Sequence, residues 1–122
     1  MAEWYEARGF GVVVRNWRSR SGEIDLVARL GDLVVICEVK TRTSDIFGSP
    51  EEAVTVAKAR RIRRLAAEWL ASARASGILG GPTTSLKGDG GDGRGGVDVR
   101  FDVASVTVRH GELLVEVIEG AF

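Results

Sequence analysis

The sequence of 122 residues is poor in cysteine, histidine and proline and has no long apolar run. A single cysteine, Cys37, excludes a disulfide framework and a cysteine-rich zinc site, and its apolar neighbours predict a buried thiol. The lone His110 has no second histidine with which to hold a metal, so we interpret it as a solvent-facing turn residue. The longest apolar run, residues 33–37, is too short to cross a bilayer, and the N-terminus does not resemble a signal peptide. A cytoplasmic location without membrane contact is the expectation.

An excess of charge of one sign is also lacking, because 17 lysines and arginines balance 17 aspartates and glutamates. A chain without net charge has no global field that attracts nucleic acid or an anionic membrane, so any basic surface must be local. A length of 122 residues suits one domain with a modest core. We therefore expect a single globular unit, residues 1–122, with one site.

The spacing of apolar residues predicts two helices and five strands. A short helix is expected over residues 2–8, ending at Gly9, and a first strand over residues 10–17, ending near Asn16. The other strands are expected at residues 22–29, 33–41, 97–110 and 112–120, with a turn at His110 and Gly111 between the last two.

A long amphipathic helix is predicted over residues 50–75. Ser49 suits its N-cap, Pro50 its first position, and the two glutamates that follow favour the helix dipole. Residues 77–96 are rich in glycine and predict a disordered loop, to which we assign no chemistry. The order of helix, three strands, helix and two strands is typical of an α/β fold with helices flanking a mixed five-stranded sheet.

Charged residues interrupt the apolar hairpin that follows the first strand. A two-residue turn at its central Gly-Asp pair places Asp25 opposite Glu38 and Glu23 opposite Lys40. Because side chains alternate along a strand, all four project from one face, with facing Cβ atoms about 4.5–5.5 Å apart. Two carboxylates held so close repel each other, so the hairpin needs a positive charge between them.

A hard divalent cation meets this need. Mg²⁺ and Mn²⁺ keep several waters and accept one or two protein carboxylates together with a substrate phosphate. Lys40 at the same edge could orient an attacking water or stabilise charge on that phosphate. A surface hairpin, with Glu23 paired to Lys40 and Asp25 solvated, explains the same spacing. The apolar flanks of both strands weigh against it, because central strands rarely carry solvated acids.

Several motifs resemble the UPF0102 family, small endonuclease-like bacterial proteins of the restriction-endonuclease-like, or PD-(D/E)xK, superfamily that are related in fold to archaeal Holliday junction resolvases. The matching segments are "RGFGVVVRNWR", "GEIDLVA", "VICEVKTR", "FGSPEEAV", "KARRI" with "AAEWL", "RFDV" and the terminal "AF". The resemblance implies a restriction-endonuclease-like fold and a homodimer. It also implies that Asp25 and Glu38 hold the metal, that Lys40 is the catalytic lysine, and that the backbone carbonyl of Val39 is a further ligand.

The sequence departs from the family pattern in two places. Relatives have a glutamate in the first helix, before an Ala-Ala-x-Tyr-Leu motif that aligns with residues 2–5, so this acid would fall upstream of Met1. Either the chain starts too late or the site lacks one member, for which Glu3 and Glu6 on the same helix are weak substitutes. Residues 77–96 resemble an insertion ahead of the "RFD" strand.

Basic residues cluster after the first strand, after the Glu-x-Lys strand and on the long helix, where they could grip a phosphate backbone without reading its sequence. A solvated helix face explains the helical ones equally well, although two of them lie in the "KARRI" segment that resembles the family. The candidates for contact with nucleic acid are Arg15, Arg18, Arg42, Lys58 and Arg61.

The sequence therefore predicts a Mg²⁺- or Mn²⁺-dependent endonuclease that hydrolyses phosphodiester bonds in DNA, branched or damaged DNA included. The alternative is a nucleic-acid-binding module of the same fold without turnover, which the missing helix glutamate favours. In a third interpretation the chain is a small partner-binding domain, and its acidic hairpin is only a salt-bridge face.

Overall fold

A computed structural model describes residues 1–42, 55–78 and 97–122 of the chain. Its elements are α1 (Ala2–Glu6), β1 (Gly11–Ser19), β2 (Gly22–Leu30), β3 (Leu33–Arg42), α2 (Val56–Ser76), β4 (Asp98–Arg109) and β5 (Glu112–Ile118). The predicted order of helices and strands is confirmed. Within these three ranges, no helix combines the length and the apolar character needed to cross a membrane.

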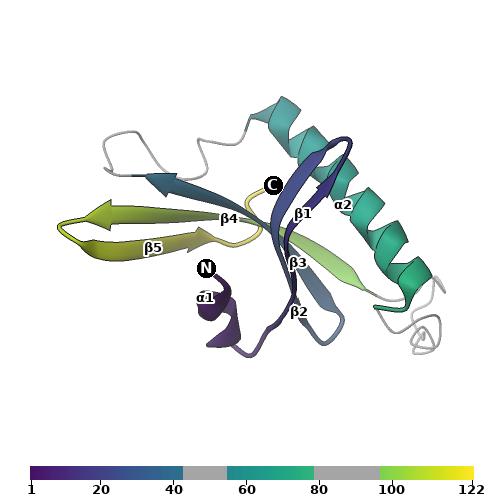
Figure 1. The fold of residues 1–122 in the computed structure, drawn as a ribbon, viewed down its shortest axis with the longest axis horizontal. Coiled ribbons are helices and arrows are strands. Elements are labelled where there is room, and N and C mark those ends of the chain that lie inside the picture. The colour runs from purple at the N-terminus through teal and green to yellow at the C-terminus, as the bar shows by residue number, and fades with distance from the viewer. Residues whose placement is uncertain (43–54, 79–96) are drawn as a thin grey trace.

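The five strands form one mixed sheet in the order β1-β2-β3-β4-β5 (Figure 1). Neighbouring strands are antiparallel except β3 and β4, which are parallel. Parallel neighbours need a crossover connection, and α2 lies in the connection between these two strands. In Figure 1, α2 runs along one side of the sheet, while α1 lies on the other side and the β4–β5 hairpin extends away from α2. The predicted α/β fold with a mixed five-stranded sheet is confirmed at this level.

Both predicted hairpin turns are confirmed. Leu30 pairs with Leu33 across the first turn, where Gly31 has a φ of 60°. This left-handed conformation favours glycine at the first position of a two-residue turn. Arg109 pairs with Glu112 across the second turn, and both residues of that turn also have positive φ.

β1 runs to Ser19, so the predicted end near Asn16 was wrong. The pairs on either side of Asn16 keep the same register with β2, although Asn16 itself has a φ of 52°. Asparagine tolerates the left-handed region better than most residues, so the strand can bend at Asn16 without ending.

The start of α2 also differs from the prediction. The helix begins at Val56, and Thr55 rather than Ser49 is its N-cap. The Thr55 hydroxyl accepts the backbone N–H of Lys58 at 3.1 Å, and the extended backbone of Thr55 separates α2 from any helix upstream. Ser49 and Pro50 themselves lie outside the described residues.

The first helix is shorter than predicted, because α1 ends at Glu6 with Ala7 as its C-cap. The chain then turns as far as Gly9, which has a φ of 91°. Gly77 ends α2 with a φ of 83°, the left-handed C-cap that glycine favours. Of the predicted glycine-rich loop over residues 77–96, only residues 77 and 78 belong to the described part of the chain.

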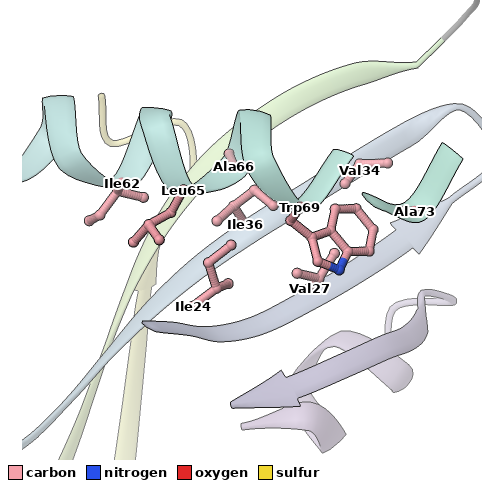
Figure 2. Packing of buried hydrophobic residues seen from close by; sticks show 9 residues of the cluster. All are labelled: Ile24, Val27, Val34, Ile36, Ile62, Leu65, Ala66, Trp69 and Ala73. Carbon is pink, nitrogen blue, oxygen red and sulfur yellow. The ribbon is translucent and has the colours of Figure 1, made fainter. Parts of the chain in front are cut away.

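The core between α2 and the sheet fixes where the helix lies. Side chains at helical spacing on α2 pack against Ile24 and Val27 of β2 and against alternating residues of β3 (Figure 2). Trp69 is the largest of them and is 3% exposed. Burial of each valine, leucine or isoleucine side chain in this cluster contributes about 1.5–3 kcal/mol. The cluster consists of Ile24, Val27, Val34, Ile36, Ile62, Leu65, Ala66, Trp69 and Ala73.

A second core covers the opposite face of the sheet beneath α1. Tyr5 is fully buried there, and Phe10 packs against it edge to face with ring centroids 5.4 Å apart. Cys37 belongs to this cluster and is 1% exposed, so the prediction of a buried thiol is confirmed. The catalytic candidates of β3 therefore lie on a strand that is packed on both faces.

Candidate active site

A cavity of about 400 Å³ opens where β2 and β3 leave the core, beside the first turns of α2. The sequence predicted that Asp25, Glu38 and Lys40 would share one face, and all three line this cavity. Lys58 and Arg61 reach it from α2, because Ile62 and Leu65 of the same helix pack against the sheet beneath. The structure thus brings together these predicted site residues: Asp25, Glu38, Val39, Lys40, Lys58 and Arg61.

Asp25 lies where the pairing of β2 with β3 stops. The ladder follows the predicted register as far as Leu26 and Cys37. Asp25 and Glu38 would be the next pair, but Oδ2 of Asp25 instead accepts the backbone N–H of Val39 at 2.8 Å. The carboxylate thus replaces a backbone acceptor of the ladder, a substitution that the period of the sequence did not indicate.

The alternation of β2 side chains between the two faces of the sheet also breaks at Asp25. Ile24 and Val27 both pack on the α2 face, whereas Leu26 packs on the α1 face. As a result Asp25 lines a second cavity of about 410 Å³, together with Glu3, Arg15, Asn16 and Thr41. Asp25 is therefore shared by two cavities.

The charge of Asp25 is poorly compensated. Burial raises the pKa of Asp25, the N–H of Val39 opposes the rise, and the negative charges of Glu38 and Glu23 add to it. The surroundings of Asp25 thus disfavour its ionised form. A cation beside Asp25 would stabilise that form, so the site favours the binding of a cation.

Two lysines converge on one oxygen of Glu38. Nζ of Lys58 lies 2.7 Å from Oε2 of Glu38, and Nζ of Lys40 lies 3.4 Å from the same oxygen. Lys58 lowers the pKa of Lys40, burial lowers it further, and Glu38 opposes both. Burial also lowers the pKa of Lys58, but its bonds to Glu38 and Lys40 outweigh burial and raise it overall. Lys58 is therefore the more firmly charged partner, and Lys40 gives up its proton more readily.

The predicted pairing of Glu23 with Lys40 was wrong. The β2–β3 ladder stops at Leu26, before it reaches Glu23. Arg18 is the partner of Glu23 on β1, and the Glu23 carboxylate lies 3.5 Å from Nε of Arg18. That pair is largely exposed, and such pairs contribute little to stability.

The predicted contacts for nucleic acid are not all in one place. Lys58 and Arg61 line the first cavity and Arg15 the second, whereas Arg18 lines neither of these two cavities and is engaged by Glu23. The side chain of Arg42 lies outside the part of the structure that is described.

The acidic residues suit a cation completed by solvent and substrate. Within the described ranges, no three histidine, cysteine, aspartate or glutamate side chains come together as a metal site of their own. Glu3 does not supply a third acid, because its side chain is 86% exposed and pairs with the N-terminal ammonium at 3.3 Å. Asp25 and Glu38 remain, and the ammonium of Lys58 already occupies a cation position on Glu38. Two carboxylates are the set that Mg²⁺ or Mn²⁺ accepts when water and a phosphate supply the remaining oxygens.

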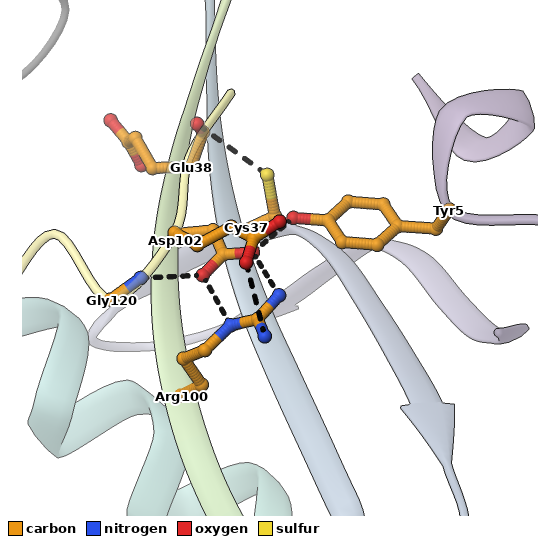
Figure 3. Close-up of polar contacts among 7 residues, drawn as sticks. Tyr5, Cys37, Glu38, Arg100, Asp102 and Gly120 are labelled. Atoms are coloured by element: carbon orange, nitrogen blue, oxygen red, sulfur yellow. Dashed lines mark hydrogen bonds and ion pairs between the residues drawn. The ribbon is translucent and has the colours of Figure 1, made fainter. Parts of the chain in front are cut away.

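One buried acid was not singled out from the sequence. Asp102 of β4 is fully buried beside Cys37 and accepts hydrogen bonds from three residues (Figure 3). The Tyr5 hydroxyl donates at 2.6 Å, the Arg100 guanidinium donates twice at 2.9 Å, and the N–H of Gly120 donates at 3.0 Å. This contact could have been predicted from one feature of the sequence. An arginine stands two residues before an aspartate in an apolar strand, and that spacing places both side chains on one face.

A second missed contact ties the β1–β2 turn to α2. The hydroxyls of Ser19 and Ser21 donate to the two carboxylate oxygens of Glu68 at 2.8 and 2.7 Å. Ser21 also lines the first cavity, so this contact helps to hold the cavity wall against the helix. The sequence feature that could have indicated this contact is the glutamate within the otherwise apolar "AAEWL" segment.

Comparison with known proteins finds a matching family model and several relatives. A model of the family described as "Uncharacterised protein family UPF0102" matches residues 1–106. A UPF0102 protein of Rhodococcus jostii is 42% identical over 122 residues, which cover 99% of this chain and 87% of its own. A UPF0102 protein of Leifsonia xyli is 56% identical over 68 residues, 56% of this chain, and the match spans only 58% of that relative's length. These descriptions name no activity.

Proposed function

This chain belongs to the uncharacterised UPF0102 family, and from its site we propose that it is a Mg²⁺- or Mn²⁺-dependent endonuclease with a restriction-endonuclease-like fold. Its substrate would be DNA, branched or damaged DNA included, and its reaction the hydrolysis of a phosphodiester bond. The observation that carries the proposal is the convergence of Asp25, Glu38 and Lys40 on one cavity that two further basic side chains also line.

Each site residue has a proposed task. Asp25 and Glu38 would hold the cation, with the backbone carbonyl of Val39 as a further donor. The bound cation would activate a water and neutralise charge that develops on the phosphate. Lys40, with its lowered pKa, would orient that water or stabilise the charged phosphate.

Basic residues on both sides of Asp25 support a polyanionic substrate. Lys58 and Arg61 line one cavity that contains Asp25, and Arg15 lines the other. Contacts of lysine and arginine with phosphates are independent of sequence and weaken as salt is added. Such contacts suit an enzyme that recognises the backbone or shape of DNA rather than its bases.

Cleavage assays on labelled linear, nicked and four-way-junction DNA test the proposal. We expect cleavage with Mg²⁺ or Mn²⁺, none with a chelator, and a loss of about 100-fold or more in Lys40→Ala. Arg74→Ala is the matched control, because Arg74 is exposed in the last turn of α2, far along the helix from the cavity. Absence of cleavage by the natural chain, or equal cleavage by Lys40→Ala, would contradict the proposal.

A non-catalytic nucleic-acid-binding module is the second candidate. It is favoured by the absence of a third metal-binding side chain within the described residues and by the lysine that already neutralises Glu38. This candidate predicts DNA binding that weakens steeply with salt, with no cleavage under any metal condition. The same assays therefore distinguish the two.

A further inference from the structure

The contact between Lys58 and Glu38 is the shortest ion pair among the described residues, with 2.7 Å between Nζ and Oε2. The side chains of Lys58 and Glu38 are only 19% and 14% exposed. A short, charge-assisted contact sheltered from water is stronger than a surface pair. Lys58 is therefore bound to the site rather than free in solvent.

The fold directs Lys58 into the cavity. Its backbone N–H is bonded to the Thr55 hydroxyl, which fixes the start of α2, and its neighbour Ala59 is buried. The first turn of α2 has no acidic residue, so Lys58 finds its acid on β3. A lysine that served only as an outer contact for DNA would not need this placement.

We infer that Lys58 is an internal counter-ion that a divalent cation must displace from Glu38. The inference rests on the proposed metal site and adds a regulatory step to it. Before a cation binds, the Lys58 ammonium neutralises Glu38, so that Asp25 and Glu38 can coexist in one cavity. Because the ammonium of Lys58 and the cation repel each other at one carboxylate, the affinity for the cation is reduced while Lys58 stays paired with Glu38.

Displacement would leave Lys58 without its acid at the rim of the cavity. A freed ammonium beside a phosphate-binding site is available to contact substrate. Binding of the cation would therefore favour binding of DNA, and by linkage DNA would favour the cation to the same degree.

Titration calorimetry with Mn²⁺ tests the inference without any need for catalysis. Lys58→Met keeps the length of the side chain and removes its charge, and we expect it to bind Mn²⁺ at least about tenfold more tightly than the natural chain. Arg61→Met is the matched control, because Arg61 lines the same cavity but forms none of the ion pairs found on Glu38 in the described residues. Its affinity should stay within about twofold.

Lys58→Arg retains the positive charge and should keep the affinity close to that of the natural chain, which separates competition from a defect in folding. Equal or weaker Mn²⁺ binding by Lys58→Met would overturn the inference, as would equal tightening by Arg61→Met. If the natural chain cleaves DNA but Lys58→Met does not gain affinity, only the role of Lys58 fails. If Lys58→Met gains affinity but the natural chain cleaves no DNA, only the nuclease proposal fails.

Discussion

Two aspartates in the same sheet have opposite surroundings. Asp102 is fully buried, and both of its oxygens accept hydrogen bonds, two of them from the guanidinium of Arg100. Asp25 is half-buried, accepts a single hydrogen bond, from Val39, among the described residues, and has two glutamates nearby that raise its pKa. The carboxylate of Asp102 is paired with a guanidinium, whereas Asp25 forms none of the ion pairs found among the described residues, and the positive charge of Lys40 offsets the rise in its pKa only in part. We take this difference as the mark of a structural acid and a functional acid.

Removal of the structural acid should have the largest effect on folding. Asp102→Ala leaves the Arg100 guanidinium and the Tyr5 hydroxyl without their buried partner. Loss of one member of a buried ion pair costs about 3–5 kcal/mol, so we expect the free energy of unfolding to fall by that amount. Urea unfolding followed by circular dichroism would measure it.

Glu119→Gln is the control for this prediction. Glu119 also lies near Arg100, at 3.6 Å, but its side chain is 53% exposed. Loss of this exposed pair should cost no more than about 1 kcal/mol. A similar loss from both variants would mean that the buried network has no special role.

Neutralisation of the functional acid should have a smaller effect of opposite sign. Asp25→Asn retains an oxygen that can accept the N–H of Val39 but removes the repulsion from Glu38. We expect the free energy of unfolding in metal-free buffer at pH 7 to rise by about 0.5–2 kcal/mol, because sites kept for function carry a cost in stability. A clear loss of stability instead would identify Asp25 as a structural residue.

The pH dependence of that difference follows from the pKa of Asp25. The folded-state pKa lies above the ordinary value of 3.8, so the charged form is disfavoured in the folded chain. The penalty is absent below the unfolded pKa, grows as pH rises between the unfolded and folded pKa, and is complete above the folded pKa. The stability gap between Asp25→Asn and the natural chain should therefore be full at pH 7 and close as pH falls below about 4. If the difference in the free energy of unfolding between the two chains stayed constant with pH, the charge of Asp25 would not be its cause.

Cys37 offers a finer probe, because it precedes Glu38 on β3 but packs beside Asp102. Burial raises the pKa of the thiol to about 12, and the side chain is 1% exposed. We expect no alkylation of the folded chain by iodoacetamide at pH 8 and rapid alkylation in urea, measured by mass spectrometry. If the native chain reacted at the rate of a free thiol, Cys37 would be exposed to the reagent, and the region around Asp102 would not be the tightly packed structure described above.

Local patterns were enough to predict much of the site. The turn at Gly31 and the period of the strands predicted the register as far as Leu26 and Cys37. Asp25, Glu38 and Lys40 line one cavity just beyond that point, as predicted, although the alternation of β2 breaks at Asp25. These features depend only on neighbours in sequence, for which alternation and turn chemistry are reliable guides.

Contacts that depend on distant segments could not be predicted in this way. The partners of Asp102 lie 97 and 18 residues away in Tyr5 and Gly120. The pairing of Lys58 with Glu38 depends on where α2 begins, and the choice of Thr55 as N-cap was not evident from the sequence. Sequence periodicity identifies faces of single elements, whereas these contacts follow from how the elements pack together.

A crystal structure of the chain soaked in Mn²⁺, with anomalous differences collected at the manganese edge, tests the central claim most directly. The account predicts an anomalous peak bound by the carboxylates of Asp25 and Glu38, with Nζ of Lys58 withdrawn from its position 2.7 Å from Glu38. An absent peak, or a peak elsewhere with the Lys58–Glu38 pair intact, would contradict it.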